Sequence, residues 1–343
     1  MRLKIVLFLI VILFNQCSML GSNDKKDETT RNNFLALFYL SQLPQLPQQG
    51  EIKFNAILNN KAVECGDTTY TLPGGQTVQM RDFRFFVQDI RLVNYDGSKT
   101  GVSFNQVDNY QYVEGSNQVG LLDFTKVGSG RCTGTSDDAS TNTKIAGSFK
   151  KGVYKGLEID IGVPGAFNHR DSTKQASTNP LKSGTGLTWA WTTGYKFVRF
   201  ELTATATNFV LHLGSTNCSG DSNIEFGNTG AVSCSNSYRP TIVIEPNGGF
   251  NPDTDTITID ADEFFKGNGG VPTSSYTSGT ALSCMPIGNG SGNNGNASTC
   301  GPILKNLGLK PGSQAGFSSS LVSETGVGTV DLTTQQPIFK VIK

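Results

Sequence analysis

Residues 82–93 read DFRFFVQDIRLV, a stretch rich in aromatic and β-branched side chains that is followed by the turn sequence Tyr95-Asp96-Gly97. Such side chains favour strands, and Asp-Gly pairs favour tight turns. The stretch therefore predicts a β-strand, and we expect it to form a hairpin with a second strand around Val102–Phe104.

Residues 51–58 show the alternation of a half-buried strand, with apolar side chains on one face at Ile52, Phe54, Ala56 and Leu58. Asn59-Asn60 supplies the turn that follows. Further strands are expected at 111–113, 119–124, 156–161, 196–203, 209–213, 241–244 and 256–259. Short strands between Gly, Asn, Asp and Ser turns, without long helical periods, are typical of a sandwich or a barrel. We expect an all-β fold, an antiparallel β-sandwich with long loops.

Composition supports this class and limits the partners. The 343 residues include 40 glycines and only 16% charged residues, as in many extracellular β proteins. The 28 acidic and 28 basic side chains cancel, so there is no electrostatic case for binding nucleic acid. We assign residues 51–343 to one domain, with 267–343 as its loop-rich, Gly/Ser/Asn-rich C-terminal extension. Residues 302–309 are expected to form one helical turn.

The N-terminus has the features of an export signal. Arg2 and Lys4 precede an apolar run of ten residues, Ile5–Phe14, which is too short to span a bilayer. Cys17 follows in the place of a lipid-modified cysteine, although Gln16 replaces the small residue that a lipobox prefers; secretion without a lipid is the alternative. We expect a signal peptide and lipobox at 1–17, a tether at 18–50 and a lipid anchor in a membrane. The expected location is the cell envelope, either the periplasm or the outer membrane and surface.

Six cysteines remain after Cys17, an even number that favours pairing in an oxidising compartment. Cys218 and Cys234 bracket one short polar loop, and Cys284 and Cys300 bracket another, which leaves Cys65 and Cys132 for each other. Fifteen connectivities are possible, and the sequence alone does not choose among them. The absence of any Cys-x-x-Cys spacing argues against a zinc ribbon or a thioredoxin-like motif.

Both histidines and both tryptophans fall between residues 169 and 212, namely His169, Trp189, Trp191 and His212. Neutral imidazole binds transition metals, and indole is oxidisable. His212 lies in an alternating strand pattern, whereas His169 lies in a loop punctuated by Pro164 and Gly165. Taken singly, each residue is more often structural. Their clustering favours a metal or redox site.

Several motifs together resemble the MbnP-like family, also called metallo-mystery pair system four-Cys motif proteins. They are Glu64-Cys65-Gly66, residues 84–93, Leu121-Leu122-Asp123-Phe124, Cys132-Thr133-Gly134-Thr135, Tyr154-Lys155-Gly156-Leu157, Gly162-Val163-Pro164, Asn168-His169-Arg170-Asp171, Trp189-Ala190-Trp191, Gly194-Tyr195-Lys196-Phe197, His212-Leu213-Gly214-Ser215 and the 300–309 segment. They follow the family's order from about residue 51 to about residue 310.

The resemblance implies an exported, non-enzymatic copper-binding protein of the kind associated with methanobactin operons. It implies a dihaem partner of the cytochrome c peroxidase type that oxidises a tryptophan to kynurenine, which then helps to bind copper, Cu(I) or Cu(II). On this basis His169 and His212 are the candidate ligands, Trp189 or Trp191 the candidate for oxidation, and Asn168 and Asp171 the residues that would orient the imidazoles.

Two departures from the family stand out. Many relatives have a methionine shortly before the tryptophan pair, where this chain has Gly186-Leu187-Thr188, and many have a histidine where Gln88 stands. A soft or extra ligand is therefore missing. The alternative function is a surface interaction or adhesin-type lipoprotein with a degenerate metal site.

The sequence gives little support for a hydrolase or a calcium-binding loop. There is no Gly-x-Ser-x-Gly motif for a hydrolase. The carboxylates Asp253, Asp255, Asp260 and Asp262 resemble a calcium loop but lack its glycine at position six and its glutamate at position twelve. We interpret them as turn and strand-edge residues.

Overall fold

The computed structural model describes residues 33, 46–72, 75–125, 132, 141–189, 194–203, 208–220, 232–266, 282–284, 303, 306–309, 322–323 and 336–342. Residues from Pro47 to Lys343 belong to one compact unit. Cys17, Trp191 and Cys300 lie outside the described residues, as does the side chain of Cys284. Among the described residues, no helix is both long and apolar enough to cross a bilayer.

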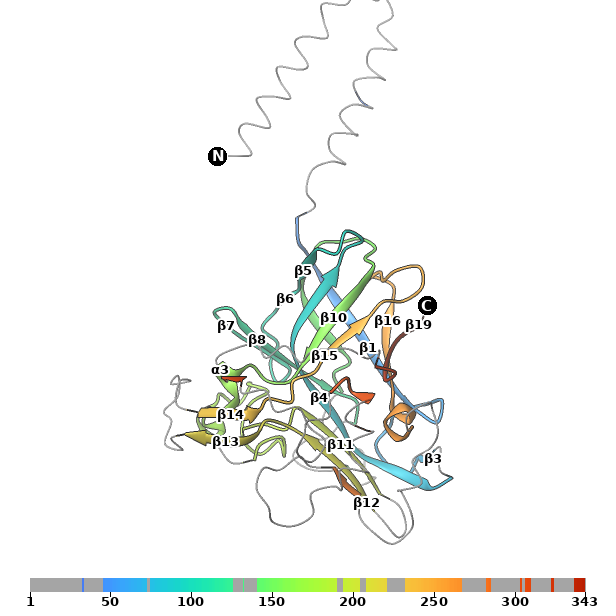
Figure 1. Ribbon diagram of the computed structural model, residues 1–343, viewed down its shortest axis with the longest axis vertical. Helices are drawn as coiled ribbons and strands as arrows, with labels where there is room; N and C mark the ends of the chain where they lie inside the picture. The colour runs from blue at the N-terminus through green and yellow to red at the C-terminus, as the bar shows by residue number, and fades with distance from the viewer. Residues whose placement is uncertain are drawn as a thin grey trace, which may run out of the picture. The chain divides into compact units, whose positions relative to one another are not determined.

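The first sheet is built on the N-terminal strand of this unit (Figure 1). Its strand order is β19 (Phe339–Ile342), β16 (Thr256–Asp260), β1 (Gln48–Leu58), β9 (Lys144–Phe149) and β6 (Ser103–Phe104), with β2 (Lys61–Ala62) also paired to β1. The predicted alternation of β1 is confirmed, since Ile52, Phe54, Ala56 and Leu58 are all buried.

The second sheet is built on the predicted strand at residues 82–93, which forms the C-terminal part of its long strand β4 (Thr77–Val93). Its order is β15 (Thr241–Ile244), β10 (Gly156–Ile161), β4, β11 (Val198–Thr203), β12 (Asn208–Leu213) and β17 (Leu282–Cys284). Three further strands pair with β4, namely β3 (Thr69–Thr71), β5 (Lys99–Gly101) and β8 (Asn117–Asp123), and β7 (Gln111–Glu114) pairs with β8. Strand β4 is long enough to pair with β11 through residues 79–85 and with β10 through residues 87–93.

The main core contains the inward faces of both sheets. Ile52 and Ile257 of the first sheet belong to the same buried cluster as Phe83, Phe85 and Phe200 of the second. The rings of Phe83 and Phe200 have their centroids 4.6 Å apart. The predicted all-β sandwich is therefore confirmed.

The C-terminal part of the chain also contributes to this core. Ile303, Leu307 and Leu309 are buried in it, and the amide of Leu307 donates to the carbonyl of Ile303, 3.2 Å away. This i to i−4 bond is the expected helical turn of segment 302–309. The short helix η3 (Ala261–Phe265) supplies two more buried rings, those of Phe264 and Phe265.

Two details differ from the sequence predictions. The strand that returns along β4 is β5, while Ser103–Phe104 crosses to the first sheet and pairs with β9. The chain thus changes sheets at Val102, whose amide still donates to Ile90 of β4. The pairings of β1 with β16 and of β12 with β17 are parallel. Alternation fixes which face a residue occupies but not the direction of its neighbouring strand.

The outer face of the second sheet is covered by residues 163–189 and 194–197, which include α3 (Gly165–Asn168) and η2 (Ser172–Lys174). Phe86 of β4 points to this side and joins a second buried cluster with Val163, Phe167, Tyr195 and Phe197. Both faces of β4 are therefore buried. A small third sheet, β13 (Thr216–Gly220), β14 (Val232–Asn236) and β18 (Val322–Ser323), completes the described strands.

Candidate functional site

His212 lies on β12 with its side chain on the outer face of the second sheet. Phe209, Leu211 and Leu213 of the same strand are buried in the main core, so alternation places His212 on the opposite side, as predicted. Its partner in the register is Arg199 of β11. Only 8% of His212 is exposed, because the covering segment lies over this part of the sheet.

A carboxylate fixes the tautomer of His212. Its Nε2 lies 2.6 Å from Oε1 of Glu201 on β11, and the same oxygen accepts a bond from Nε of Arg199 at 2.8 Å. Burial would raise the pKa of Glu201, but the hydrogen bonds from His212 and Arg199 outweigh it and lower the pKa to about 2. The carboxylate is ionised, so Nε2 of His212 carries the hydrogen and donates it.

The other ring nitrogen of His212 is then a lone-pair donor. Burial lowers the pKa of His212, more strongly than Glu201 raises it, so the imidazole is neutral. Its Nδ1 is buried and has no hydrogen-bond partner among the residues that the structure describes. Histidines that bind metals usually donate their second ring N–H to a carboxylate or carbonyl. His212 has this arrangement, and an imidazole nitrogen of this kind suits copper.

Among the residues that the structure describes, Trp189 is the aromatic side chain next to His212. The two ring centroids are 6.4 Å apart, with the ring planes at 56°. The backbone of Trp189 is held by antiparallel pairing of Thr188 with Tyr195, in which the amide of Trp189 donates to Gly194 and that of Lys196 donates to Leu187. A Cβ on Gly214, just after β12, would lie 2.7 Å from Cζ3 of the indole, so only glycine permits this approach. The predicted association of Trp189 with His212 has a geometric basis; Trp191 lies outside the described residues.

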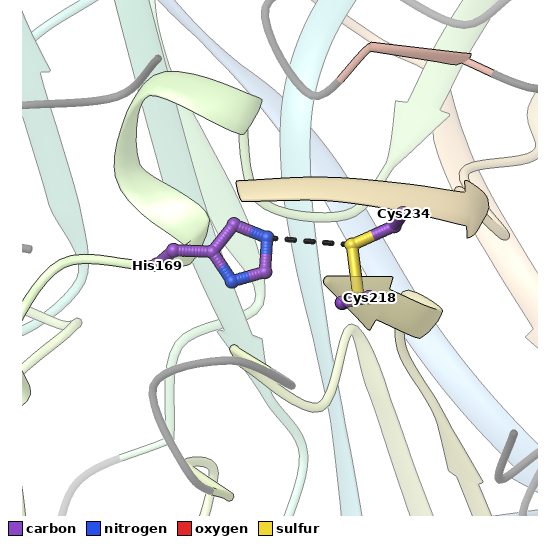
Figure 2. A group of neighbouring side chains, drawn as sticks. All are labelled: His169, Cys218 and Cys234. Atoms are coloured by element: carbon purple, nitrogen blue, oxygen red, sulfur yellow. Dashed lines mark hydrogen bonds between the residues drawn. A yellow bond between two sulfur atoms is a disulfide. The ribbon is translucent and has the colours of Figure 1, made fainter. Parts of the chain in front are cut away.

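His169 follows α3 as its C-terminal cap and projects toward the third sheet (Figure 2). The amide of Tyr195 donates to Oδ1 of Asn168 at 3.0 Å, which turns Nδ2 of Asn168 toward His169 Nε2 at 3.1 Å. This nitrogen therefore accepts, and it also lies 3.5 Å from Sγ of Cys234. Asn168 thus holds the ring of His169 through this hydrogen bond.

A small pocket links the two neighbourhoods. Its lining includes Asn168, Arg170, Thr188, Trp189 and Tyr195. Asn168 thus lies beside His169 and also on the wall that Trp189 forms. The structure therefore brings Trp189 next to both His212 and the turn that carries His169.

Asp171, the other predicted orienting residue, caps η2. Its Oδ1 accepts from the amide of Thr173 at 2.9 Å and from the Thr173 hydroxyl at 2.7 Å. These bonds fix the turn that follows His169.

A buried ionic layer beneath Trp189 was not predicted from the sequence. Asp82 and Arg84 of β4 form a bidentate pair, and Arg199 of β11 joins Asp82 to Glu201. Lys196 donates to the carbonyl of Gly186, and burial, followed by repulsion from Arg199, lowers its pKa to about 8. Charged residues alternating with phenylalanine in Phe83-Arg84-Phe85 and Arg199-Phe200-Glu201 were the available signal, and it usually indicates a solvated face.

The disulfides follow the predicted local pairing where both partners are described. Cys218 forms a disulfide with Cys234, and the two residues lie directly opposite each other on β13 and β14. Cys65 forms a disulfide with Cys132. Cys284 lies on β17, but the predicted pair with Cys300 falls outside the described side chains.

The aspartates that resembled a calcium loop have structural partners. Asp253 forms an ion pair with Lys151, and Asp255 accepts the amide of Asn251 at 2.9 Å. Asp260 caps η3 and pairs with Lys340. Among the described residues, the cluster with metal-ligand spacing is instead that of His169, Cys218 and Cys234.

Comparisons with known proteins agree with this architecture. The family model MbnP matches residues 47–286. Among solved structures, "MbnP from Methylosinus trichosporium" is similar with a TM-score of 0.61 and 23% identity, over 86% of this chain and 98% of that chain. Comparison with curated protein sequences gives no match.

Proposed function

Because the chain belongs to the MbnP family, we propose that it is an exported copper-binding protein without catalytic activity of its own. The observation that carries the proposal is the buried Nδ1 of His212. Glu201 holds the other nitrogen of this ring, and the lone pair of Nδ1 has no partner among the described side chains. Leaving such a nitrogen without a partner costs free energy that a bound cation would recover.

His212 and His169 are the proposed imidazole ligands. Neutral imidazole binds both Cu(I) and Cu(II). Glu201 orients the first ring and Asn168 the second, and the buried ionic layer keeps Glu201 ionised. Nδ1 of His212 is the preset lone pair, and Trp189 lies beside this ring and on the pocket wall next to Asn168.

Trp189 is the better supported candidate for oxidation, because its ring lies beside His212. Conversion to kynurenine is a four-electron oxidation that adds two oxygen atoms across the indole C2–C3 bond and breaks it; water then hydrolyses the N-formyl group, which leaves as formate. A dihaem partner of the cytochrome c peroxidase type, drawing on peroxide, would remove the electrons. The product has an aniline nitrogen and a ketone, which supply a donor that indole lacks.

Copper binding tests the proposal directly. Protein purified with its disulfides intact is titrated with Cu(I) in competition with a chromophoric chelator. We expect His212→Ala and His169→Ala to lose the tight site, whereas Asp253→Asn, which alters an exposed carboxylate, keeps it. Equal copper affinity in all four proteins would favour the alternative, a surface interaction protein that retains only the outline of the site.

Peptide mass spectrometry tests the tryptophan. Protein from the native host, or co-expressed with its dihaem neighbour, is expected to carry the kynurenine mass at Trp189 and none in Trp189→Phe. Modification confined to Trp191 would reject Trp189 as the target.

Attachment to a membrane through Cys17 is a separate proposal. We expect Cys17→Ser to move the protein from the membrane fraction to the soluble envelope fraction. Unchanged fractionation would support secretion without a lipid.

A further inference from the structure

His169, one of the two proposed copper ligands, also lies beside two sulfur atoms that the copper proposal does not use. Its Nε2 and the sulfurs of Cys218 and Cys234 all lie within 4.8 Å of one another. The three residues come from separate elements, the end of α3, β13 and β14, and Figure 2 shows the imidazole pointing at the disulfide. As long as the disulfide is intact, neither sulfur is a thiolate, and thiolates are the form that binds metals.

We propose that reduction of the Cys218–Cys234 disulfide creates a soft-metal site from the two thiolates and His169 Nε2, with Cu(I) as its best occupant. This goes beyond the proposed function, because it uses sulfur ligands and exists only in the reduced protein. Thiolates select Cu(I) and zinc among biological metals, and zinc with three protein ligands keeps a water as its fourth ligand. His169 and Cys234 are buried, which leaves little access for that water and favours Cu(I).

The imidazole is already prepared for this role. Asn168 donates its amide N–H to His169 Nε2, so this nitrogen is the unprotonated one of the ring, and it lies 3.5 Å from Sγ of Cys234. Cu(I) would take its lone pair in place of the Asn168 hydrogen. His169 is 5% exposed and Cys234 is fully buried, so water competes little for the ligand positions. The strand register places Cys218 directly opposite Cys234, which keeps the two sulfurs together after their bond is broken.

The same geometry gives a route for reduction. Cys218 is partly exposed and Cys234 is buried, so an external dithiol meets the sulfur of Cys218 first. Cys234 is then the leaving sulfur; once protonated, it can donate its S–H to His169 Nε2, 3.5 Å away. The dithiol is oxidised to a disulfide and supplies two electrons and two protons to the cysteines. Binding of Cu(I) by both thiolates releases those two protons.

The test compares oxidised and reduced protein in the His212→Ala background. This variant lacks one of the two imidazoles of the proposed copper site and keeps His169. Reductant is removed under anaerobic conditions, and Cu(I) is titrated against a chromophoric chelator. We expect one tightly bound Cu(I) after reduction and none before. Bound Cu(I) should also protect Cys218 and Cys234 from iodoacetamide, as read by peptide mass spectrometry. If His212 proves irrelevant to copper, this result is unaffected.

Matched variants assign the ligands. Every disulfide is open in the reduced protein. Reduced Cys65→Ser/Cys132→Ser therefore differs from the reduced parent only by two sulfur-to-oxygen replacements, and it should retain the ion. Cys218→Ser/Cys234→Ser should lose it, and His169→Ala should weaken it at least about tenfold. Retention in the Cys218/Cys234 variant, loss in the Cys65/Cys132 variant or collapse of the near-ultraviolet circular dichroism on reduction would each overturn the proposal.

Discussion

Glu201 decides which nitrogen of His212 is available to a metal. Replacement by glutamine removes the charge that holds the ring's N–H while keeping the side chain's size. We expect Glu201→Gln to weaken copper binding about 10-fold to 100-fold, the usual effect of losing such a partner. Chelator competition measures the affinity, and nitrogen NMR of the imidazole measures the tautomer. Glu245→Gln, which alters an exposed partner of Lys155, is the control. A loss of affinity without any change of tautomer would contradict this role.

Asp123 carries a separate prediction about stability and pH. Burial raises its pKa to about 6, against the lowering effects of the Thr125 amide and Arg84. The folded protein then holds this proton more tightly than the unfolded chain, so the free energy of unfolding falls as pH rises from about 4 to about 6. Asp123→Asn keeps an oxygen for Thr125 and removes the charge.

We therefore expect Asp123→Asn to gain stability relative to wild type as pH rises, by about 3 kcal/mol at most between pH 4 and pH 7. Urea unfolding across this range measures the difference. Asp67→Asn, at an exposed position, should follow the wild-type curve. A constant difference between Asp123→Asn and wild type at all pH values would show that burial does not govern this carboxyl.

The sequence selected His169, His212 and Trp189 as candidate site residues because rare side chains cluster in one segment, and the structure places Trp189 beside His212. It missed Glu201, because a glutamate in a strand is usually solvated, and its burial here comes from a covering segment that local alternation does not reveal. Cys234 was predicted only as a disulfide partner. Its approach to His169 depends on how the third sheet sits beside α3.

Among the elements, the pairing of Thr188 with Tyr195 packs against Gly214, the residue that follows β12. Gly214→Ala would push a methyl group against the Trp189 ring and the carbonyl of Tyr195. We expect a loss of about 1–3 kcal/mol in the free energy of unfolding, as is usual for overpacking. In a Trp191→Phe background, a shifted Trp189 fluorescence spectrum would report the displacement.

The matched control is Gly101→Ala on β5, where an added Cβ meets no atom within 4 Å. Its stability and tryptophan emission should equal those of the parent. If both alanine variants behave alike, close packing at Gly214 does not position the indole.

The sequence predicted the buried face of a strand correctly where that face is apolar. It failed to predict which strands pair when the partners are distant in sequence. The β1 and β12 patterns gave the correct inward faces because alternation is local. The hairpin after β4 was placed in register with residues 102–104, whereas the chain leaves the sheet at Val102 so that Phe104 enters the main core. No local signal marks such a crossing. Strand β9 was missed although Ile145 and Phe149 alternate with small residues.

On the scale of the whole molecule, the sandwich closes through contacts that are distant in sequence. Strand β1 pairs with β16, and β19 from the end of the chain completes the same sheet. A disulfide lowers the conformational entropy of the unfolded chain, and this loss increases with the logarithm of the number of residues in the closed loop. The Cys65–Cys132 bridge spans 67 residues and the Cys218–Cys234 bridge spans 16.

We therefore expect Cys65→Ser/Cys132→Ser to lose about 4 kcal/mol and Cys218→Ser/Cys234→Ser about 3 kcal/mol of unfolding free energy. Denaturant unfolding without reductant measures both. The order matters more than the absolute values, because chain entropy ranks the bridges by loop length alone. If the shorter loop proves the costlier one to open, the contacts of Cys234 with His169 contribute folding energy beyond entropy. The His169→Ala variant, with its disulfide intact, would then show part of the same loss.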